Sequence, residues 1–269
     1  MTDSFKYEKD GSNIVTVTMD MRGSVNAIND EFIDAMRSTL DKLKAEADLA
    51  GVVITSAKKT FIAGGDLNDL VAAQPGEEHG VFVRTEGIKA LLRQIEKLPV
   101  PVVAAINGAA LGGGLEVCLC CNYRLAVDSR AVLLGLPEVG LGLLPGGGGV
   151  VRLTSLLGFE KAFPFLIDGK KLGAAPALAA GLIHETVATP EELLPRAKAW
   201  ILANPDNAVQ PWDVKGFKIP GGGEENPLIR QGIVFAAAGL QKKTRGLLPA
   251  PAMILDIMVE TLRVDLDTA

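Results

Sequence analysis

Two glutamates, Glu116 and Glu138, stand alone in apolar, glycine-rich surroundings. Glu116 is the first charged residue after an uncharged run of 18 residues, 98–115. Glu138 is flanked by Leu136-Pro137 and by Val139-Gly140-Leu141. Concerted proton transfer to carbon and oxygen needs two carboxylates in unlike environments, because each environment sets its own pKa. We therefore expect the chemistry of this chain at these two residues.

The two environments favour different protonation states. Glu116 falls in the first turn of a predicted helix, 113–121, where the helix macrodipole favours the carboxylate anion. That suits a general base or an acceptor that binds water, although first-turn glutamates are also common as plain helix-terminus charges. Glu138 follows a proline in an apolar loop, where desolvation raises the pKa of a carboxyl group and favours the neutral acid. The competing interpretation of Glu138 is a salt bridge to an arginine.

Two glycine turns accompany the glutamates. Ala63-Gly64-Gly65-Asp66 and Gly112-Gly113-Gly114 each end a strand-like run and open a helix. Backbone N–H groups at such places lack a helical partner and can hold a developing negative charge. Glycine also lets a ligand approach the backbone closely. One such turn alone is best interpreted as a tight turn, but the pair beside two glutamates indicates an oxyanion hole.

The composition excludes several classes of function. With 269 residues, 48% apolar and 22% charged, the chain can bury a full core. A net charge of -5, with only two Trp and two Tyr, gives no electrostatic footprint for nucleic acid. The first ten residues are polar and lack the apolar core of a signal peptide, so we expect a cytoplasmic protein.

The uncharged run is long enough to suggest a membrane span. It contains Pro99, Pro101, Asn107 and four glycines, and its β-branched residues cluster at its start. A buried strand, a turn and a helix start explain this pattern better. We therefore expect no membrane span.

Nucleophilic and metal chemistry have few residues to use. His79 in a polar loop and His184 in an alternating segment are expected at the surface, and neither has a neighbouring Ser or Cys in a strained turn. Cys118, Cys120 and Cys121 fall in one short helical segment with no His nearby, so we expect buried, reduced thiols and no metal site. Acid–base work therefore falls to carboxylates, without a metal or redox cofactor.

The elements that must position these residues alternate between strand and helix. Predicted strands cover 13–19, 52–55, 102–106, 123–127, 131–134 and 183–188. Predicted helices include 30–46 capped by Asn29, 81–97, 113–121, a helix ending at 157, 161–167 and 174–180. This rhythm is typical of an α/β fold with parallel strands. We expect a core over residues 1–195 and a helical C-terminal region over 196–269.

Three ordered motifs match one family. They are F-I-A-G-G-D at 61–66, A-A-I-N-G-A-A-L-G-G-G-L-E at 104–116 and G-L-P-E-V-G-L-G-L-L-P-G-G-G-G at 135–149. Together they closely resemble the crotonase (enoyl-CoA hydratase/isomerase) superfamily, over roughly residues 10–200. The resemblance implies a crotonase-like spiral of ββα turns, a coenzyme A thioester substrate with no separate cofactor, and an oxyanion hole for the thioester carbonyl.

The resemblance also implies roles for individual residues. The oxyanion hole would use the N–H groups of Gly65 and Gly113; many hydratases have alanine where this chain has Gly65, and the N–H remains. Glu116 would bind and activate water, and Glu138 would exchange a proton at the α-carbon of the substrate. The presence of both glutamates favours hydration over isomerisation. The implied coenzyme A contacts are Arg22, Val25, Ala27, Ala63, Gly64, Asp66 and Leu67.

Further segments resemble the N-terminal hydratase part of the multifunctional fatty-acid oxidation enzyme. They are Y-R-L-A-V-D, W-D-V-K-G-F-K-I-P-G-G and P-A-P-A-M-I-L-D-I. In that family a 3-hydroxyacyl-CoA dehydrogenase follows, but no dinucleotide-binding fingerprint is present here, so we expect the hydratase portion alone. The implied assembly is a homo-oligomer of the trimer type or, in a full-length chain, a complex with a thiolase subunit. The alternatives are a Δ3-Δ2-enoyl-CoA isomerase and a non-catalytic CoA-binding module of a larger complex.

Overall fold

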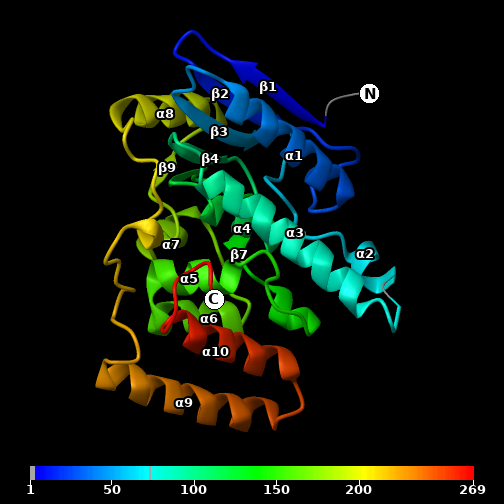
Figure 1. Ribbon diagram of the computed structural model, residues 1–269, viewed down its shortest axis with the longest axis vertical. Helices are drawn as coiled ribbons and strands as arrows, with labels where there is room; N and C mark the ends of the chain where they lie inside the picture. The colour runs from blue at the N-terminus through cyan, green and yellow to red at the C-terminus, as the bar shows by residue number, and fades with distance from the viewer. Residues whose placement is uncertain (1–3, 73) are drawn as a thin grey trace.

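The computed structural model describes residues 4–72 and 74–269, leaving aside the side chains of 68–70, and its centre is a six-stranded sheet. The strands are β1 (Phe5–Lys9), β2 (Ile14–Met19), β3 (Gly51–Ser56), β4 (Val102–Ile106), β6 (Tyr123–Val127) and β9 (Glu185–Val187). They lie in the order β1-β2-β3-β4-β6-β9 (Figure 1). β1 pairs antiparallel with β2, and all other neighbours run parallel. The predicted α/β fold with parallel strands is confirmed.

Parallel pairing explains why β3 and β4 are almost wholly apolar. Every residue of both strands is buried, as is usual where helices cover both faces of a parallel sheet. The strands pair in register, with Val52 opposite Val102 and Ile54 opposite Ala104. The predicted strand 102–106 has the observed bounds, and the prediction 52–55 is one residue short at each end.

Two parts of the sheet structure differ from the predictions. β1 is not among the predicted strands. Only Phe5 of its five residues is buried, which is typical of an edge strand with one face in water. A second, small sheet joins β5 (Ala110–Leu111), β7 (Leu134–Gly135) and β8 (Lys171–Leu172). The predicted strand 131–134 is wrong except for its last residue. The N–H of Ala131 bonds instead to Ser129 Oγ in a turn.

The other elements are helices. Those of the first half are α1 (Asp30–Ala45), α2 (Leu67–Ala72), α3 (Glu78–Glu96) and α4 (Gly113–Leu119). Those that follow are α5 (Gly149–Leu157), α6 (Phe159–Ile167), α7 (Ala174–Ala179), α8 (Pro190–Ala203), α9 (Pro227–Thr244) and α10 (Pro249–Thr261), with 3-10 helices η1 (Glu138–Leu141) and η2 (Pro211–Asp213). Asn29 caps α1 as predicted, because its side chain accepts a hydrogen bond from the N–H of Phe32 at 3.0 Å.

The uncharged run 98–115 folds as the interpretation against a membrane span predicts. It forms β4, a turn, the short β5 and the start of α4. Among the residues that the structure describes, no helix combines the length and the apolar character needed to cross a bilayer.

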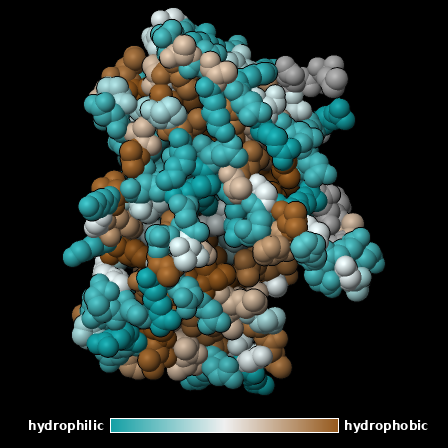
Figure 2. Space-filling model, in the orientation of Figure 1, coloured by the Kyte–Doolittle hydropathy of each residue, from teal (hydrophilic) through white to brown (hydrophobic). Residues whose placement is uncertain are grey.

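The last two helices lie together at one end of the molecule (Figure 1). α10 packs on α5 and α6, and α9 packs on α10 and α6. Apolar side chains are exposed in this region (Figure 2), and Val234, Phe235 and Met253 are among those of α9 and α10 that face solvent. The division into a core over 1–195 and a helical region over 196–269 stays a prediction.

The loops that follow β2 and β3 are tied together by a buried amide. The two strands are parallel neighbours, so their carboxyl ends meet at one edge of the sheet. Asn26 is wholly buried; its Oδ1 accepts from the N–H of Met21 at 3.1 Å. Its Nδ2 donates to Ser56 Oγ at 2.9 Å and to the carbonyl of Phe61 at 3.1 Å. These bonds fix the segment 22–27 against the segment 61–67.

The loop that follows β4 joins the same edge. Asn107 Nδ2 donates to the carbonyl of Lys58 at 2.7 Å, which links this loop to the one after β3. Gly108 packs so closely on Lys59 that a Cβ would overlap the Lys59 carbonyl oxygen, so only glycine fits there. Three loops therefore converge where the sequence places its glycine turns.

We expect Asn26→Ala to lower the free energy of unfolding by on the order of 3 kcal/mol. The variant leaves the N–H of Met21 and the carbonyl of Phe61 without their buried partner. The control is Asn226→Ala, which removes the cap of α9 in a solvent-exposed position and should cost about 1 kcal/mol. Urea denaturation of both variants checks the difference, and equal losses would contradict a special role for the Asn26 network.

Candidate active site

The structure brings the two predicted glycine turns together around Ile28. The N–H of Ile28 donates to the carbonyl of Gly64 at 2.8 Å, and Ile28 forms an isolated β-bridge with Gly65. A Cβ built on Gly113 would lie 2.6 Å from Ile28 Cγ1. Within the described residues, the N–H groups of Gly65 and Gly113 donate no hydrogen bond. Both groups are therefore free to hold an anionic oxygen.

Glu138, the first residue of η1, lies against the second glycine turn. A Cβ built on Gly112 would lie 2.6 Å from Glu138 Oε1 and 3.7 Å from the Cα of Gly64. Gly112 also has a φ of +53°, which favours glycine independently of the available space. The carboxyl group of Glu138 therefore lies beside both glycine turns.

The environment of Glu138 is that of a neutral acid at moderate pH. Its Oε2 is buried and has no hydrogen-bond partner among the described residues. Burial, which is the larger cause, and the charge of Glu116 together raise the pKa of Glu138 to about 7. The direction agrees with the desolvation predicted from the apolar flanks, and no arginine offsets it. A carboxyl group with such a pKa can both give and take a proton near neutrality.

Glu116 lies in the first turn of α4, as predicted, and its side chain is almost wholly enclosed. The residue is 4% exposed, and its Oε1 accepts a hydrogen bond from the N–H of Gly149 at 2.7 Å. Burial raises the pKa of Glu116, although the N–H of Gly149 and the positive charge of Arg152 oppose this. The lowering of the Glu116 pKa predicted for a helix start is thus smaller than the rise caused by burial, because α4 has only seven residues and Glu116 is almost wholly enclosed.

The glycine run before α5 forms the other wall around Glu116. A Cβ on Gly147 would lie 2.6 Å from Glu116 Oε2, and one on Gly149 would lie 2.9 Å from Glu116 Cγ. The sequence predicts this run only as a turn that enters a helix. The sequence signal for this contact is the run of four consecutive glycines directly before an apolar helix. Such a run indicates that another group approaches the backbone closely, but it does not identify Glu116 as that group.

The raised pKa of Glu138 predicts that folding stability falls with rising pH. A group whose pKa is higher in the folded state stabilises the fold below its unfolded pKa, and this stabilisation is lost as the pH rises through the folded value. For Glu138 the window runs from its ordinary value of 4.5 to about 7. The loss should be about 3 kcal/mol. Urea denaturation at pH 5 and pH 8 should show a smaller loss in Glu138→Gln than in the wild type; an equal loss would contradict the assigned pKa.

The residues implied as coenzyme A contacts come from two loops that lie side by side. The N–H of Ala63 donates to the carbonyl of Asn26 at 2.9 Å, and the N–H of Asp66 donates to the carbonyl of Ile28 at 3.2 Å. The exposed members are Arg22, Val25, Ala63 and Leu67, the half-buried ones are Ala27 and Asp66, and Gly64 is buried. The structure therefore brings the two groups together, and their contact with coenzyme A stays a prediction.

The histidines and the cysteines have the exposure that the sequence predicts. His79 and His184 are exposed, and the ring of His184 stacks on Tyr123 with centroids 4.8 Å apart. The three cysteines are free and buried, as predicted, and burial raises the pKa of their thiols. In the part of the chain that the structure describes, His, Cys, Asp and Glu form no cluster suited to a metal ion.

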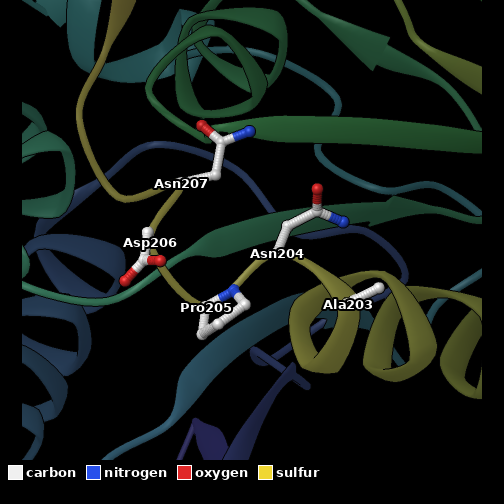
Figure 3. A pocket seen from close by; sticks show the side chains of 5 residues that line it. All are labelled: Ala203, Asn204, Pro205, Asp206 and Asn207. Atoms are coloured by element: carbon white, nitrogen blue, oxygen red, sulfur yellow. The ribbon is translucent and has the colours of Figure 1, made fainter.

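A surface hollow of about 400 Å³ follows the end of α8 (Figure 3). Its lining residues are Ala203, Asn204, Pro205, Asp206 and Asn207. None of these residues is among those of the candidate active site.

Comparison with known proteins connects this geometry to a family. A family model described as enoyl-CoA hydratase/isomerase matches residues 9–210. The chain is 41% identical over 261 residues to a Shewanella loihica protein named fatty acid oxidation complex subunit alpha, covering 95% of this chain and 36% of that protein. It is 37% identical over 261 residues to the Shewanella halifaxensis protein of the same name, with the same coverage. The chain thus spans about a third of the length of the curated relatives it matches.

Two solved structures support the same connection. An enoyl-CoA hydratase from Geobacillus kaustophilus superposes with a TM-score of 0.70 at 27% identity, covering 76% of this chain and 75% of that one. An enoyl-CoA hydratase from Bacillus anthracis superposes with a TM-score of 0.68 at 25% identity, covering 96% of this chain and 90% of that one. The predicted crotonase-like fold is confirmed by this similarity.

Proposed function

Because this chain belongs to the enoyl-CoA hydratase/isomerase family, we propose that it adds water reversibly to a trans-2-enoyl-CoA, giving the 3-hydroxyacyl-CoA. The observation that carries the proposal is the placement of two carboxyl groups, one buried and one half-buried, against glycine-rich turns. Glu138 lies against Gly112, and Glu116 accepts a hydrogen bond from the N–H of Gly149. The charge of Glu116 contributes to the raised pKa of Glu138.

The roles follow from which groups can hold charge and which can hold a proton. The thioester carbonyl oxygen accepts hydrogen bonds from the free N–H groups of Gly65 and Gly113, which stabilise the charge that develops on it during addition. Glu116 takes a proton from water as the water oxygen bonds to C3 of the substrate. Glu138, in its neutral form, gives its proton to C2. Water is thereby added across the double bond, and the two carboxyl groups exchange protonation states, which solvent resets after product release.

The environments of the two glutamates support this division of labour. Glu116 accepts an N–H bond and faces the charge of Arg152, both of which stabilise its anion against burial. Glu138 lacks such partners among the described residues and has a pKa of about 7. The group that must begin ionised therefore has partners that oppose the effect of burial on its pKa, and the group that must begin protonated has a pKa raised to about 7.

Coenzyme A would lie along the two loops after β2 and β3. The exposed guanidinium of Arg22 suits a phosphate of the nucleotide part, and the neighbouring backbone at Ala63 suits its polar edges. The substrate thioester would then reach Gly65 at the end of the same loop. This path supports the proposal because it leads from the surface directly to the free N–H groups.

Product analysis tests the reaction type. Incubation with a trans-2-enoyl-CoA should give the 3-hydroxyacyl-CoA. Incubation with a 3-enoyl-CoA should leave little of the 2-enoyl isomer unhydrated. Formation of only the 2-enoyl isomer from the second substrate, with no hydration of the first, would assign an isomerase instead. Binding of both substrates without conversion would assign a non-catalytic module.

The relatives named as alpha subunits of a fatty acid oxidation complex motivate a proposal about assembly. We propose that this chain works in the cytoplasm, either as a homo-oligomer of the trimer type or beside a thiolase subunit when it is part of a longer chain. Light scattering on the purified chain distinguishes a monomer from a trimer.

A further inference from the structure

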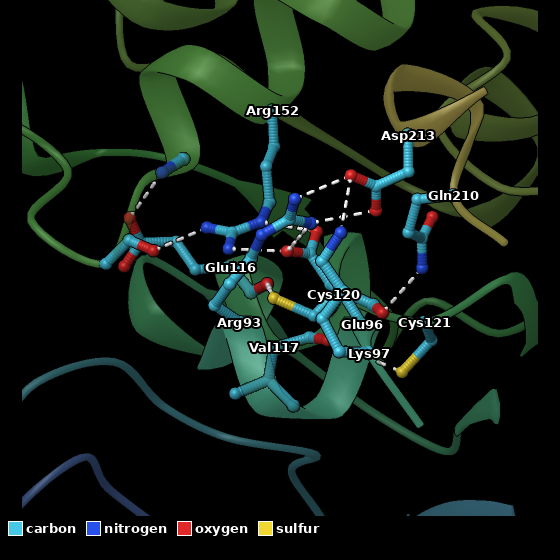
Figure 4. Close-up of polar contacts among 12 residues, drawn as sticks. Arg93, Glu96, Lys97, Glu116, Val117, Cys120, Cys121, Arg152, Gln210 and Asp213 are labelled. Carbon is cyan, nitrogen blue, oxygen red and sulfur yellow. Dashed lines mark hydrogen bonds and ion pairs between the residues drawn. The ribbon is translucent and has the colours of Figure 1, made fainter. Parts of the chain in front are cut away.

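The guanidinium group of Arg152 contacts the glycine run that encloses Glu116 (Figure 4). Arg152 belongs to the first turn of α5 and is 4% exposed. Its Nη1 donates to the carbonyl of Gly147 at 2.7 Å. Gly148 has a φ of +91°, and a Cβ there would overlap Arg152 Nη1, so the arginine can reach this place only over glycine. The run therefore contacts Arg152 on one side and Glu116 on the other.

Arg152 is itself held by a buried carboxylate. Its Nε donates to Glu96 Oε1 at 2.8 Å, and its Nη2 donates to Glu96 Oε2 at 3.0 Å. The Glu96 side chain has no exposed surface. This two-bond geometry fixes the plane of the guanidinium, which a single bond would leave free to rotate.

A second arginine steadies Glu96 from the solvent side. Arg93 Nη1 donates to Glu96 Oε2 at 3.0 Å. Arg93 also forms two bonds to Asp213, at 2.6 Å and 2.9 Å, and it pairs with Asp267 at 2.7 Å. Glu96 is therefore fixed from both sides, while the charges of Asp213 and Asp267 stay at the outer end of the network.

We propose that Arg152 is a positioning residue for hydration, which fixes the turn 147–149 so that its N–H groups hold Glu116 as the carboxylate that receives the proton of water. This inference rests on the proposed function. Glu96 acts through Arg152, and neither residue touches the substrate. The charge of Arg152 also favours the anion of Glu116.

The groups that face Glu116 come from three elements. They are Arg152 of α5, Glu138 of η1 and Cys120, which directly follows α4. Arg152 is the only positive charge among them within the described residues, and it lowers the pKa of Glu116 against the effect of burial. Removing this charge should raise the pKa of Glu116. As the pH is lowered, activity that needs ionised Glu116 should therefore begin to fall at a higher pH than in the wild type.

The variants separate charge from geometry. Arg152→Gln removes the charge but retains an amide N–H near the position of Nε, where it can still donate to Glu96, and Arg152→Lys retains the charge but loses the two-bond contact with Glu96. The control is Asp213→Asn, which weakens the outer end of the network without touching Arg152 or Glu116. All three are compared by circular dichroism and melting before any rate is measured.

The experiment measures kcat and KM for crotonyl-CoA from pH 5 to pH 9. For Arg152→Gln we expect kcat to fall roughly 10- to 100-fold with little change in KM, because a displaced carboxylate reacts poorly while the substrate still binds. The acidic limb of the kcat/KM profile should move to higher pH in Arg152→Gln and should return toward the wild-type position in Arg152→Lys. Asp213→Asn should lower the melting temperature and leave the limb in place.

Three outcomes overturn the inference. The first is an Arg152→Gln variant whose acidic limb and kcat equal those of the wild type. The second is an acidic limb that moves as far in Asp213→Asn as in Arg152→Gln. The third is a fall in kcat that matches the loss of folded protein. If Arg152→Gln does not fold, Arg152→Lys decides: unchanged kcat at its optimum contradicts a role for the two-bond geometry.

A second readout separates this inference from the proposed function. The protein is labelled with ¹³C at its glutamate carboxyl groups and titrated by NMR in the absence of substrate. The Glu116→Gln variant assigns the resonance of Glu116. A wild-type protein that does not hydrate crotonyl-CoA contradicts the proposed function. A Glu116 resonance that titrates at the same pH in the wild type and Arg152→Gln contradicts the inference about Arg152, whatever the activity.

Discussion

Replacing Glu138 by glutamine is expected to lower the turnover of enoyl-CoA hydration by about 10²- to 10⁴-fold. The amide has nearly the shape of the acid but cannot give a proton to C2 of the substrate. Its position against Gly112 should be retained, because the side chain keeps its volume. Measurement of kcat and KM for the hydration of crotonyl-CoA by both proteins checks the expectation.

The stability of the Glu138→Gln variant provides an internal control. Because burial already opposes the charge of Glu138, loss of that charge should leave the melting temperature unchanged or higher at pH 8. The matched control Glu160→Gln changes an exposed glutamate in the first turn of α6 and should affect neither rate nor stability. A Glu138→Gln variant that is inactive because it unfolds, or that retains nearly full activity, would contradict the role of Glu138.

Replacing Glu116 by glutamine is expected to lower hydration turnover by a similar factor, about 10²- to 10⁴-fold, for a different reason. The amide oxygen can still accept the hydrogen bond of Gly149, but it cannot take a proton from water. Proton exchange at C2 should continue, because that step uses Glu138. The two variants should therefore lose hydration together and differ in exchange.

Exchange of the C2 hydrogens of butyryl-CoA in D₂O, followed by NMR, separates the two roles. Butyryl-CoA has no double bond to hydrate, so it reports only on proton transfer at C2. We expect exchange with Glu116→Gln and none with Glu138→Gln. The reverse pattern would exchange the roles of the two glutamates, and loss of exchange in both would mean that Glu116 also acts at C2.

Much of the site was predictable because its signals are local. Glu116 and Glu138 stand out because each is a lone charge among apolar residues, and burial of an isolated carboxyl group indicates a function. The cap at Asn29 and the strand 102–106 are likewise encoded within a few neighbouring residues. The convergence of the glycine turns follows from the parallel strands, whose carboxyl ends meet at one edge.

What could not be predicted depends on contacts between distant parts of the chain. The sequence does not show that Gly149 donates to Glu116, 33 residues away, or that Arg152 pairs with Glu96, 56 residues away. For the same reason it misjudges the balance at Glu116. The helix start is visible in the sequence, but the full burial that outweighs it comes from the run 147–149 closing over α4.

The most direct test of the account follows the absorbance of the conjugated thioester when crotonyl-CoA is mixed with the wild-type protein and, in parallel, with Glu138→Gln. We expect a rapid loss of absorbance with the wild type and almost none with the variant at equal concentration of folded protein. An unchanged absorbance with the wild type, while crotonyl-CoA binds, would contradict the proposed hydratase activity. Equal loss with both proteins would contradict the assignment of proton transfer to Glu138.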